Sequence, residues 1–467
     1  MSSYSVISPE ILAKIEEIVG TTNVTTDSDK MYPYSHDEEG DPHYQKLPEA
    51  VAWAESTDQV SQLIKLANEA HFPVTPRGAG TGLAAGAAPL LGGLVLSLEK
   101  MNKILEVNED HLFVIAQAGA LTEEVQKAAL AKGLFYAGDP CSGDSCSIGG
   151  NVATNAGGNK AVKYGTTREQ VLEIEVVNPL GEVVRLGGRI AKTSTGYALK
   201  HLIIGSEGTL GIITEVTLKL LPNPVEVMDF LVVFPEVPVA ISTVGKILKA
   251  GIDPTCLEFM DNEAVKSVER YLGEKLPHGE NGHYLIVQVE GKDETDLEDK
   301  AIALDELCTE CGAIAVLVAD PKKIWQARKD FAEAVRAESL IHNKEDVVVP
   351  IDKIPELMEI SQQIGERYGL VTRTASHAGD GNTHLLILKN DTPDEEWEEL
   401  SRKFQTDLYE AVYRLGGKMS GEHGIGAKRQ TWMEQFTPQA ELHMMQAIKK
   451  GLDPNHILNP NKIFKLS

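Results

Sequence analysis

Three glycine-rich segments between residues 77 and 211 constrain the fold of this chain more than any other feature of its sequence. They read RGAGTG from residue 77, GDPCSGDSCSIGGNVATNAGGNKAVKYG from residue 138 and GSEGTLG from residue 205. Because glycine allows close approach to the backbone, such segments form tight turns or bind a ligand through backbone N–H groups. Three of them, all next to strand-like sequence, favour one long ligand held by several loops. A turn-rich β domain without a ligand remains the alternative.

The first glycine segment lacks the dinucleotide-binding pattern of a Rossmann fold. That pattern requires G-x-G-x-x-G at the start of a helix and an acidic residue about 20 positions later. Here the sequence continues as LAAGAAPLLGG, which glycines and a proline interrupt. We therefore expect an irregular loop after residue 82. We also expect residues 138–165 to be too irregular for the interior of a helix or strand.

Hydrophobic periodicity indicates the surrounding elements. Residues 56–70 carry apolar side chains at i, i+3, i+4 and i+7, which predicts a helix after a strand at 49–54. Residues 171–188 predict a hairpin that turns at the Asn-Pro-Leu-Gly sequence. After Pro222 and Pro224, two successive strand–helix–strand patterns between residues 230 and 318 predict a ferredoxin-like split βαβ layer.

Composition excludes several classes of function. The chain has 44 basic and 69 acidic residues, a formal charge of −25, which argues against general affinity for nucleic acid or an anionic membrane. The first twenty residues contain no basic segment followed by an apolar run, and no stretch predicts a membrane span, so we expect a cytoplasmic protein. Cys308 and Cys311 form a lone CxxC in a helical pattern, and we expect buried core residues rather than a metal or redox pair.

Three pieces of the C-terminal half contain residues that could carry chemistry. They are HAGDGNTH at 377–384, SGEHGIG at 420–426, and WQAR at 325–328 followed by Lys344. Glycines bracket the histidines and the Glu-His pair, so these side chains can converge on one point. Two histidines and a carboxylate form a divalent-metal site with open coordination positions. The residues alone favour a surface salt bridge for Arg328 and a solvated surface charge for Lys344.

Together, PRGAGTG, SIGGNVATNAGG and GSEGTLGIITE resemble the FAD-binding domain of vanillyl-alcohol oxidase (PCMH) type flavoproteins. From about residue 46 to the C-terminus, the chain resembles the FAD-dependent D-2-hydroxyacid dehydrogenases. This family includes bacterial D-lactate dehydrogenases, glycolate oxidase D subunits and D-2-hydroxyglutarate dehydrogenases. The resemblance implies an α+β protein with a two-part FAD-binding domain, a ferredoxin-like cap domain for the substrate and a C-terminal helical segment. The expected divisions are an N-terminal helical segment at 1–45, the FAD-binding domain at 46–224, the cap domain at 225–419 and a segment returning to the flavin at 420–467.

The resemblance also implies how FAD is held. Some relatives carry a histidine in the first loop that bonds covalently to the flavin, and this chain has none there, which implies a non-covalent cofactor. The first loop is expected to surround the pyrophosphate, and the later segments to line the isoalloxazine and ADP portions. The expected cofactor-binding residues are Arg77, Gly78, Ala79, Gly80, Thr81, Gly82, Pro140, Ser147, Gly149, Gly150, Asn155, Gly158, Glu207, Gly211 and Ile212.

The C-terminal motifs resemble the family's HxGDGNxH and SGEHGxG. This resemblance implies zinc, iron or manganese bound by His377, His384 and Glu422. It further implies a set of residues that act on the substrate: Asn382 as a contact, Arg328 and Lys344 on the carboxylate, and His423 as the general base. The reaction implied is oxidation of D-lactate to pyruvate by hydride transfer to flavin N5.

The sequence contains no NAD-binding fingerprint and no ferredoxin-type run of cysteines, so it offers no internal route for the electrons. Relatives pass them to a quinone, a cytochrome, an iron–sulfur partner or electron-transferring flavoprotein, and the acidic chain without a membrane segment favours a soluble protein partner. The family implies electron-transferring flavoprotein, in a complex that bifurcates electrons to NAD and ferredoxin. Alternatives are a glycolate or D-2-hydroxyglutarate dehydrogenase with another acceptor, a non-redox flavoenzyme similar to alkyl-dihydroxyacetone-phosphate synthase, and a catalytically idle flavoprotein subunit. The sequence leaves the oligomeric state open, with a homo-oligomer among the options.

Overall fold

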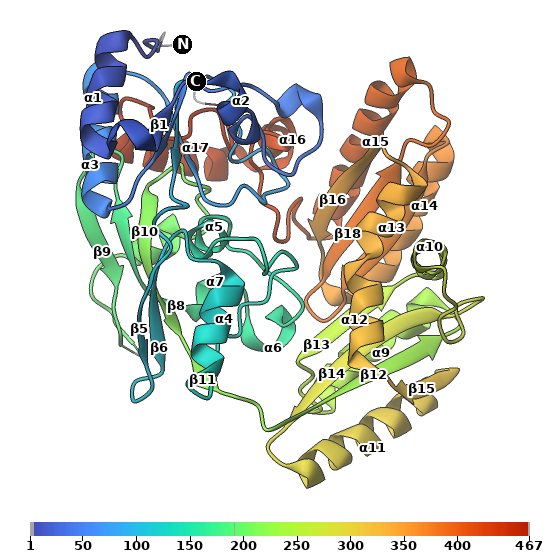
Figure 1. Cartoon of the computed structure of the whole chain (residues 1–467). Coiled ribbons are helices and arrows are strands. Elements are labelled where there is room, and N and C mark those ends of the chain that lie inside the picture. Colours follow the sequence, from blue (N-terminus) through green and yellow to red (C-terminus); the bar gives the residue numbers. More distant parts are fainter. Residues whose placement is uncertain (1–3, 191, 466–467) are drawn as a thin grey trace. The chain divides into compact units, whose positions relative to one another are not determined.

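The structure is a computed structural model of the chain and describes residues 4–190 and 192–465 (Figure 1). It consists of two compact units, each built from separate stretches of chain. Unit 1 comprises Met1–Ala156, Thr166–Asn223 and His423–Ser467, and unit 2 comprises Gly157–Gly165 and Pro224–Glu422. The chain therefore leaves each unit and returns to it. The four-part division expected from the sequence stays a prediction.

Unit 1 begins with a small, mostly parallel sheet of order β1-β2-β4-β3. The predicted helix at 56–70 is confirmed as α3, capped by the Ser56 hydroxyl, which accepts from the Gln59 N–H. Its apolar stripe is buried, with Val60, Leu63 and Ile64 inaccessible to solvent. The elements of this part are α1 (Pro9–Val19), β1 (Val24–Thr25), α2 (Ser28–Met31), β2 (Ala50–Trp53), α3 (Thr57–Ala70), β3 (Val74–Arg77) and β4 (Leu94–Ser97).

The second sheet of unit 1 has five antiparallel strands in the order β5-β6-β10-β8-β9. The predicted hairpin is confirmed as β8 and β9, and the Gly181 N–H donates to the Asn178 carbonyl in its turn. The strands are β5 (Ile104–Asn108), β6 (Phe113–Gln117), β8 (Val171–Val177), β9 (Val183–Gly187) and β10 (Ile212–Lys219), with a separate pair β7 (Leu134–Phe135) and β11 (Leu221–Pro222). The helices of this part and of the C-terminal stretch are α4 (Thr122–Leu130), α5 (Ile148–Thr154), α7 (Thr167–Gln170), α8 (Leu199–Ile203), α16 (Gln430–Phe436) and α17 (Gln439–Leu452).

The second glycine segment is more regular than its composition indicates. The expectation of no helix within 138–165 was wrong, because α5 occupies Ile148–Thr154 and the short α6 occupies Ala161–Tyr164. Ser147 caps α5 by accepting from the Gly150 N–H. A Cβ on Gly149 would lie 2.5 Å from that of Ala118. This glycine therefore serves close packing of the helix rather than a turn. The loop expected after residue 82 is confirmed.

Unit 2 is built on one antiparallel sheet of seven strands in the order β15-β12-β14-β13-β17-β18-β16. When β12 to β15 are numbered 1 to 4 in chain order, their order in the sheet is 4-1-3-2, which is that of a split βαβ layer. The ferredoxin-like prediction is therefore confirmed. The strands are β12 (Glu226–Phe234), β13 (Cys256–Met260), β14 (His283–Gly291), β15 (Ala315–Val318), β16 (His342–Val348), β17 (Val371–His377) and β18 (Asn382–Leu388).

Helices cover both faces of this sheet, as Figure 1 shows for unit 2. A buried cluster that includes Met260, Ala375 and Leu386 packs against α10, α12 and α13. The helices are α9 (Val237–Lys249), α10 (Asn262–Leu272), α11 (Glu294–Glu310), α12 (Pro321–Lys329), α13 (Phe331–Glu338), α14 (Ile354–Tyr368) and α15 (Asp394–Arg414). Among the described residues, no helix combines the length and apolar character needed to cross a bilayer.

Cys308 and Cys311 were expected to be buried core residues, and this is confirmed for Cys308 alone. Cys308 is fully buried in α11, whereas Cys311 at the end of the helix is only partly buried, and its sulfur accepts from the Lys246 ammonium at 3.2 Å. Neither forms a disulfide. Burial raises the pKa of the Cys308 thiol to about 12, so this thiol stays protonated and unreactive.

Candidate active site

The two histidines of HAGDGNTH lie on one face of the hairpin formed by β17 and β18. His377 is opposite Asn382, and His384 is opposite Ala375 two positions away, so the two imidazoles are diagonal neighbours across the strands. Their rings meet edge to face with centroids 5.0 Å apart. The turn between them needs glycine, because Gly381 has a φ of +90° and a Cβ there would lie 2.0 Å from the Val349 carbonyl oxygen.

Glu422 completes a three-residue donor set with these histidines. Its Oε1 atom lies 3.6 Å from Nε2 of His377 and 3.3 Å from Nε2 of His384. Ligands that each lie about 2.1 Å from one ion are about 3.0–3.4 Å apart, so this spacing fits a divalent cation. Nε2 of His377 is buried and makes no hydrogen bond with any described residue. A buried nitrogen without a partner is costly unless something binds it. The donor set therefore fits the expected metal.

The charges within the donor set also favour a cation. Burial alone would raise the pKa of the Glu422 carboxyl, but the adjacent imidazoles of His377 and His384 hold that pKa well below its ordinary value. Burial alone would lower the pKa of His377, but the adjacent carboxylates, Glu258 first, hold it well above its ordinary value. The site thus places a full negative charge between two imidazoles.

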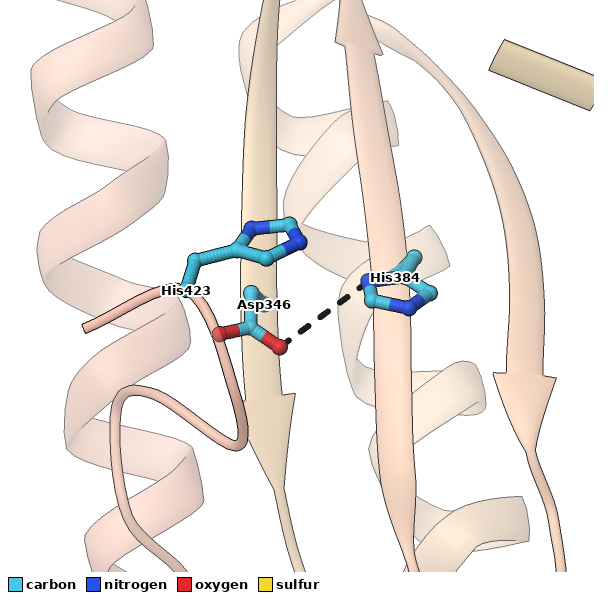
Figure 2. Close-up of side chains that lie close together, drawn as sticks. All are labelled: Asp346, His384 and His423. Atoms are coloured by element: carbon cyan, nitrogen blue, oxygen red, sulfur yellow. Dashed lines mark ion pairs between the residues drawn. The ribbon is translucent and has the colours of Figure 1, made fainter. Parts of the chain in front are cut away.

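Asp346 on β16 holds the segment that carries Glu422. Its Oδ2 atom accepts from the Ser420 hydroxyl at 2.7 Å and from the N–H groups of Gly421 and Glu422 at 3.1 Å each. Its Oδ1 atom lies 3.9 Å from Nδ1 of His384, which is opposite Asp346 on β18, as the dashed line in Figure 2 shows. One fully buried carboxylate thus connects two of the three donors.

Asn382 is positioned by the same carboxylate. Its amide nitrogen donates to Oδ1 of Asp346 at 2.7 Å and to the Val347 carbonyl at 3.0 Å. Both N–H groups are therefore used within the protein. In this orientation, the atom that Asn382 can offer to a substrate is its carbonyl oxygen, which accepts hydrogen bonds.

Arg328 is buried, not at the surface. It lies in the last turn of α12 with 5% of its surface exposed, and its guanidinium donates from Nε at 2.9 Å to Oε2 of Glu258, with Nη2 at 2.8 Å from the same atom. The surface salt bridge that its spacing alone favoured is therefore wrong. The other oxygen of Glu258 pairs with Nδ1 of His377 at 2.7 Å. The same carboxylate thus contacts a predicted metal donor and the predicted substrate arginine.

Lys344 lies on the strand that carries Asp346, and His423 lies next to Glu422 in the sequence. Lys344 is on β16, two positions before Asp346, so both side chains are on the same face of the sheet. β16 begins at His342, so Lys344 is within the strand. His423, also drawn in Figure 2, follows Glu422 directly in the chain and is the first residue of its stretch in unit 1. The roles of Lys344 and His423 stay predictions.

Sequence reasoning missed Glu258 and Asp346. Glu258 is the one acidic residue of the otherwise apolar strand β13, and Asp346 directly precedes an apolar run of three valines. A charged residue in a strand buried on both faces is rare unless it is paired. An acidic residue next to apolar strand residues was therefore the sequence signal that could have identified both.

The first predicted cofactor loop leaves the end of β3. Arg77 is the last residue of the strand, and its guanidinium donates to the carbonyls of His36 at 2.6 Å and Pro33 at 2.9 Å. This arginine is therefore tied to the N-terminal segment. Gly78 passes so close to α5 that a Cβ would lie 2.2 Å from the Ser147 hydroxyl oxygen. The main chain of the loop is thus brought next to the second glycine segment, as a backbone-lined cofactor site requires.

The other predicted cofactor residues of unit 1 shape the turns around this loop. Asn155 ends α5 with a φ of +54°, and its side-chain oxygen accepts from the Arg168 N–H. The Glu207 carboxylate accepts from the N–H groups of Ile425 and Gly426 at 2.8 and 2.7 Å, so it holds the stretch after the SGEH motif. The remaining predicted positions in unit 1 lie in the first loop, before or within α5 and at the start of β10: Ala79, Gly80, Thr81, Gly82, Pro140, Gly150, Gly211 and Ile212. Gly158 falls in the stretch assigned to unit 2.

Comparison with known proteins identifies the family. Residues 48–187 match the FAD binding domain model, and residues 224–463 match the model of the FAD linked oxidases, C-terminal domain. The chain is 39% identical to D-lactate dehydrogenase of Anaerostipes hadrus, over 98% of both chains. It is 34% identical to glycolate oxidase subunit GlcD of Bacillus subtilis, over 98% of this chain and 97% of that protein.

The fold matches solved flavoprotein structures. The structure of p-cresol methylhydroxylase superimposes with a TM-score of 0.80 at 17% identity, over 97% of this chain and 96% of that chain. This likeness agrees with the expected vanillyl-alcohol oxidase (PCMH) type fold. The chain therefore belongs to the FAD-linked oxidase family that includes the bacterial D-lactate dehydrogenases and glycolate oxidase D subunits, and it is an FAD-binding oxidoreductase.

Proposed function

We propose that this chain oxidises D-lactate to pyruvate with FAD and a divalent metal ion and passes the electrons to electron-transferring flavoprotein. The observation that carries the proposal is the donor set of His377, His384 and Glu422 in a member of this family. The 39% identical relative is named D-lactate dehydrogenase, which supports the choice of substrate.

Two bound groups supply chemistry that side chains lack. FAD supplies the acceptor for a hydride, and a divalent ion supplies positive charge that orients and acidifies a 2-hydroxy acid. The protein's own residues do the rest. Arg328 and Lys344 hold the substrate carboxylate, for which the planar guanidinium fork is well suited. The Asn382 carbonyl accepts from the substrate, and an imidazole nitrogen of His423 takes the hydroxyl proton as the Cα hydrogen leaves with its electron pair.

Each turnover releases two electrons, which the acceptor must remove. We favour electron-transferring flavoprotein in the cytoplasm, with bifurcation to NAD and ferredoxin, because the sequence contains neither an NAD-binding fingerprint nor a ferredoxin-type run of cysteines. This part is tested by mixing the reduced enzyme with purified electron-transferring flavoprotein and following reduction of its flavin. Reduction by D-lactate that requires the enzyme supports the acceptor. No reduction, in enzyme that reduces a dye, contradicts it.

The substrate is tested by steady-state reduction of an artificial dye. D-lactate, L-lactate, glycolate and D-2-hydroxyglutarate are compared in protein loaded with zinc, iron or manganese, and pyruvate is measured as product. The highest kcat/KM is expected for D-lactate, with no turnover of L-lactate. A preference for glycolate or D-2-hydroxyglutarate contradicts the substrate assignment. Failure of all four substrates contradicts the dehydrogenase proposal and favours a non-redox flavoenzyme.

A further inference from the structure

Glu258 is a fully buried carboxylate in the centre of the sheet of unit 2. It lies on β13, whose five residues are all buried, and it is opposite His377 on β17. Burying a carboxylate costs several kcal/mol unless charged partners surround it. Its carboxylate oxygens face nitrogen atoms of His377 and Arg328, a histidine and an arginine that could compensate this cost. The burial of Glu258 therefore depends on these two partners.

Each oxygen of Glu258 serves a different partner. Oε1 is 2.7 Å from Nδ1 of His377, and Oε2 accepts from Nε of Arg328 at 2.9 Å, with Nη2 at 2.8 Å. The two partners come from a strand and a helix that are 49 positions apart at these residues (377 minus 328). One side chain thus fixes the orientation of both groups.

We propose that Glu258 is a positioning residue that links metal binding to binding of the substrate carboxylate. The inference rests on the proposed function. On the metal side, a carboxylate on Nδ1 holds the proton there, so that Nε2 presents its lone pair toward the other donors. On the substrate side, a carboxylate on Nε and Nη2 of Arg328 fixes the plane of its guanidinium before the substrate arrives. Binding then costs less conformational entropy, because the side chain is already ordered.

The test compares Glu258→Gln with a matched control. Glutamine keeps the shape but lacks the charge, so both contacts weaken whichever way the amide turns, because charge-assisted hydrogen bonds are about twice as strong as neutral ones. Glu345→Gln is the control. Glu345 is an equally buried carboxylate on β16, bonded to Gln405 and Tyr409, and its side chain is on the opposite face of the sheet from Asp346.

Two constants are measured on the flavin-loaded protein. The first is the dissociation constant for Zn²⁺, from titration of metal-depleted protein in a chelator buffer. The second is KM for D-lactate at saturating Zn²⁺, with kcat recorded beside it. For Glu258→Gln we expect Zn²⁺ affinity to fall about 10–100-fold and KM to rise about tenfold, a loss of roughly 1.4 kcal/mol of binding. Both constants should be unchanged in Glu345→Gln.

A folded Glu258→Gln protein in which either constant stays within twofold of the wild type contradicts the proposal. If that variant does not fold, Glu258→Asp replaces it, because it keeps the charge and draws the carboxylate back by about 1.5 Å. The same two changes are expected there with smaller factors, and unchanged constants overturn the inference. If the wild type does not oxidise D-lactate, the proposed function fails, but the Zn²⁺ titration still decides whether Glu258 positions His377.

Discussion

The imidazole rings of His377 and His384 meet edge to face, with their centroids 5.0 Å apart, because the two residues are diagonal neighbours on adjacent strands. Replacing either histidine by alanine removes one of three donors and leaves the backbone of the hairpin intact. We expect each variant to fold and to lose at least 100-fold in metal affinity, more than the roughly 10–100-fold cost of losing an outer contact.

The measurement is metal content after dialysis against a weak chelator. His443→Ala is the control, since His443 is exposed on α17 of unit 1. Wild-type metal content in both His377→Ala and His384→Ala would show that the donor set is not the metal site.

The turn between the histidines is expected to tolerate no side chain at Gly381. A Cβ would lie 2.0 Å from the Val349 carbonyl oxygen, and the φ of +90° is unfavourable for other residues. Gly369→Ala is the control. Gly369 ends α14 with a φ of +69° and open space around it, so this substitution should destabilise the fold only by the backbone strain of about 1–2 kcal/mol. We expect Gly381→Ala to lower the free energy of unfolding by about 2 kcal/mol more than Gly369→Ala does, because the backbone must also shift. The same shift should lower metal affinity. Equal midpoints of urea unfolding for the two variants would contradict this.

The cap of α10 predicts a pH dependence of stability. Burial raises the pKa of the Asp261 carboxyl to about 6, although the residue accepts from the Ala264 N–H. A raised pKa means that the folded state holds a proton that the unfolded state has released. The contribution to stability is therefore present below about pH 4 and is lost as the pH rises through about 6.

Asp261→Asn keeps the cap and carries no charge. It should be more stable than the wild type by on the order of 2 kcal/mol at pH 7.5, with the difference shrinking toward pH 4. The check is urea unfolding of both proteins at each pH. A difference that does not change with pH would exclude titration of Asp261 as its cause.

Cys308 is expected to resist thiol reagents in the native protein. Its thiol is buried in α11, and its pKa is raised to about 12, whereas Cys141 is exposed. A disulfide exchange reagent at pH 8 should therefore label Cys141 within minutes and Cys308 only after unfolding. Peptide mapping by mass spectrometry distinguishes the two sites. Rapid native labelling of Cys308 would show that α11 opens or that the thiol is more acidic than its burial indicates.

The sequence predicted elements whose signals are local. The stripe of α3 and the hairpin of β8 and β9 follow from spacing and turn residues alone, and both are confirmed. The ferredoxin-like strand order could also be predicted from the sequence, because two strand–helix–strand units of this size have few alternative topologies. Helix α5 was missed because Gly149 and Gly150 argue against a helix, and the contact with Ala118 that explains Gly149 is not visible from sequence.

The site was predicted where glycines bracket the reactive residues, and missed where distant strands supply its support. Glu258 lies 119 positions before His377 in sequence and becomes its partner only through the pairing of β13 with β17. The buried contact of Arg328 with Glu258 is also distant in sequence, at 70 positions, and forms where α12 packs on the sheet. Pairing of this kind is set by the whole sheet, and no window of sequence contains it.

The most direct test of the account is anaerobic mixing of the purified flavoprotein with D-lactate, following the flavin absorbance in metal-replete and metal-depleted samples. The account predicts rapid bleaching of the metal-replete protein by D-lactate and not by L-lactate. It also predicts at least 100-fold slower bleaching after metal removal, restored by adding the ion back. Bleaching at the same rate with and without metal, or none in the metal-replete protein, would contradict it.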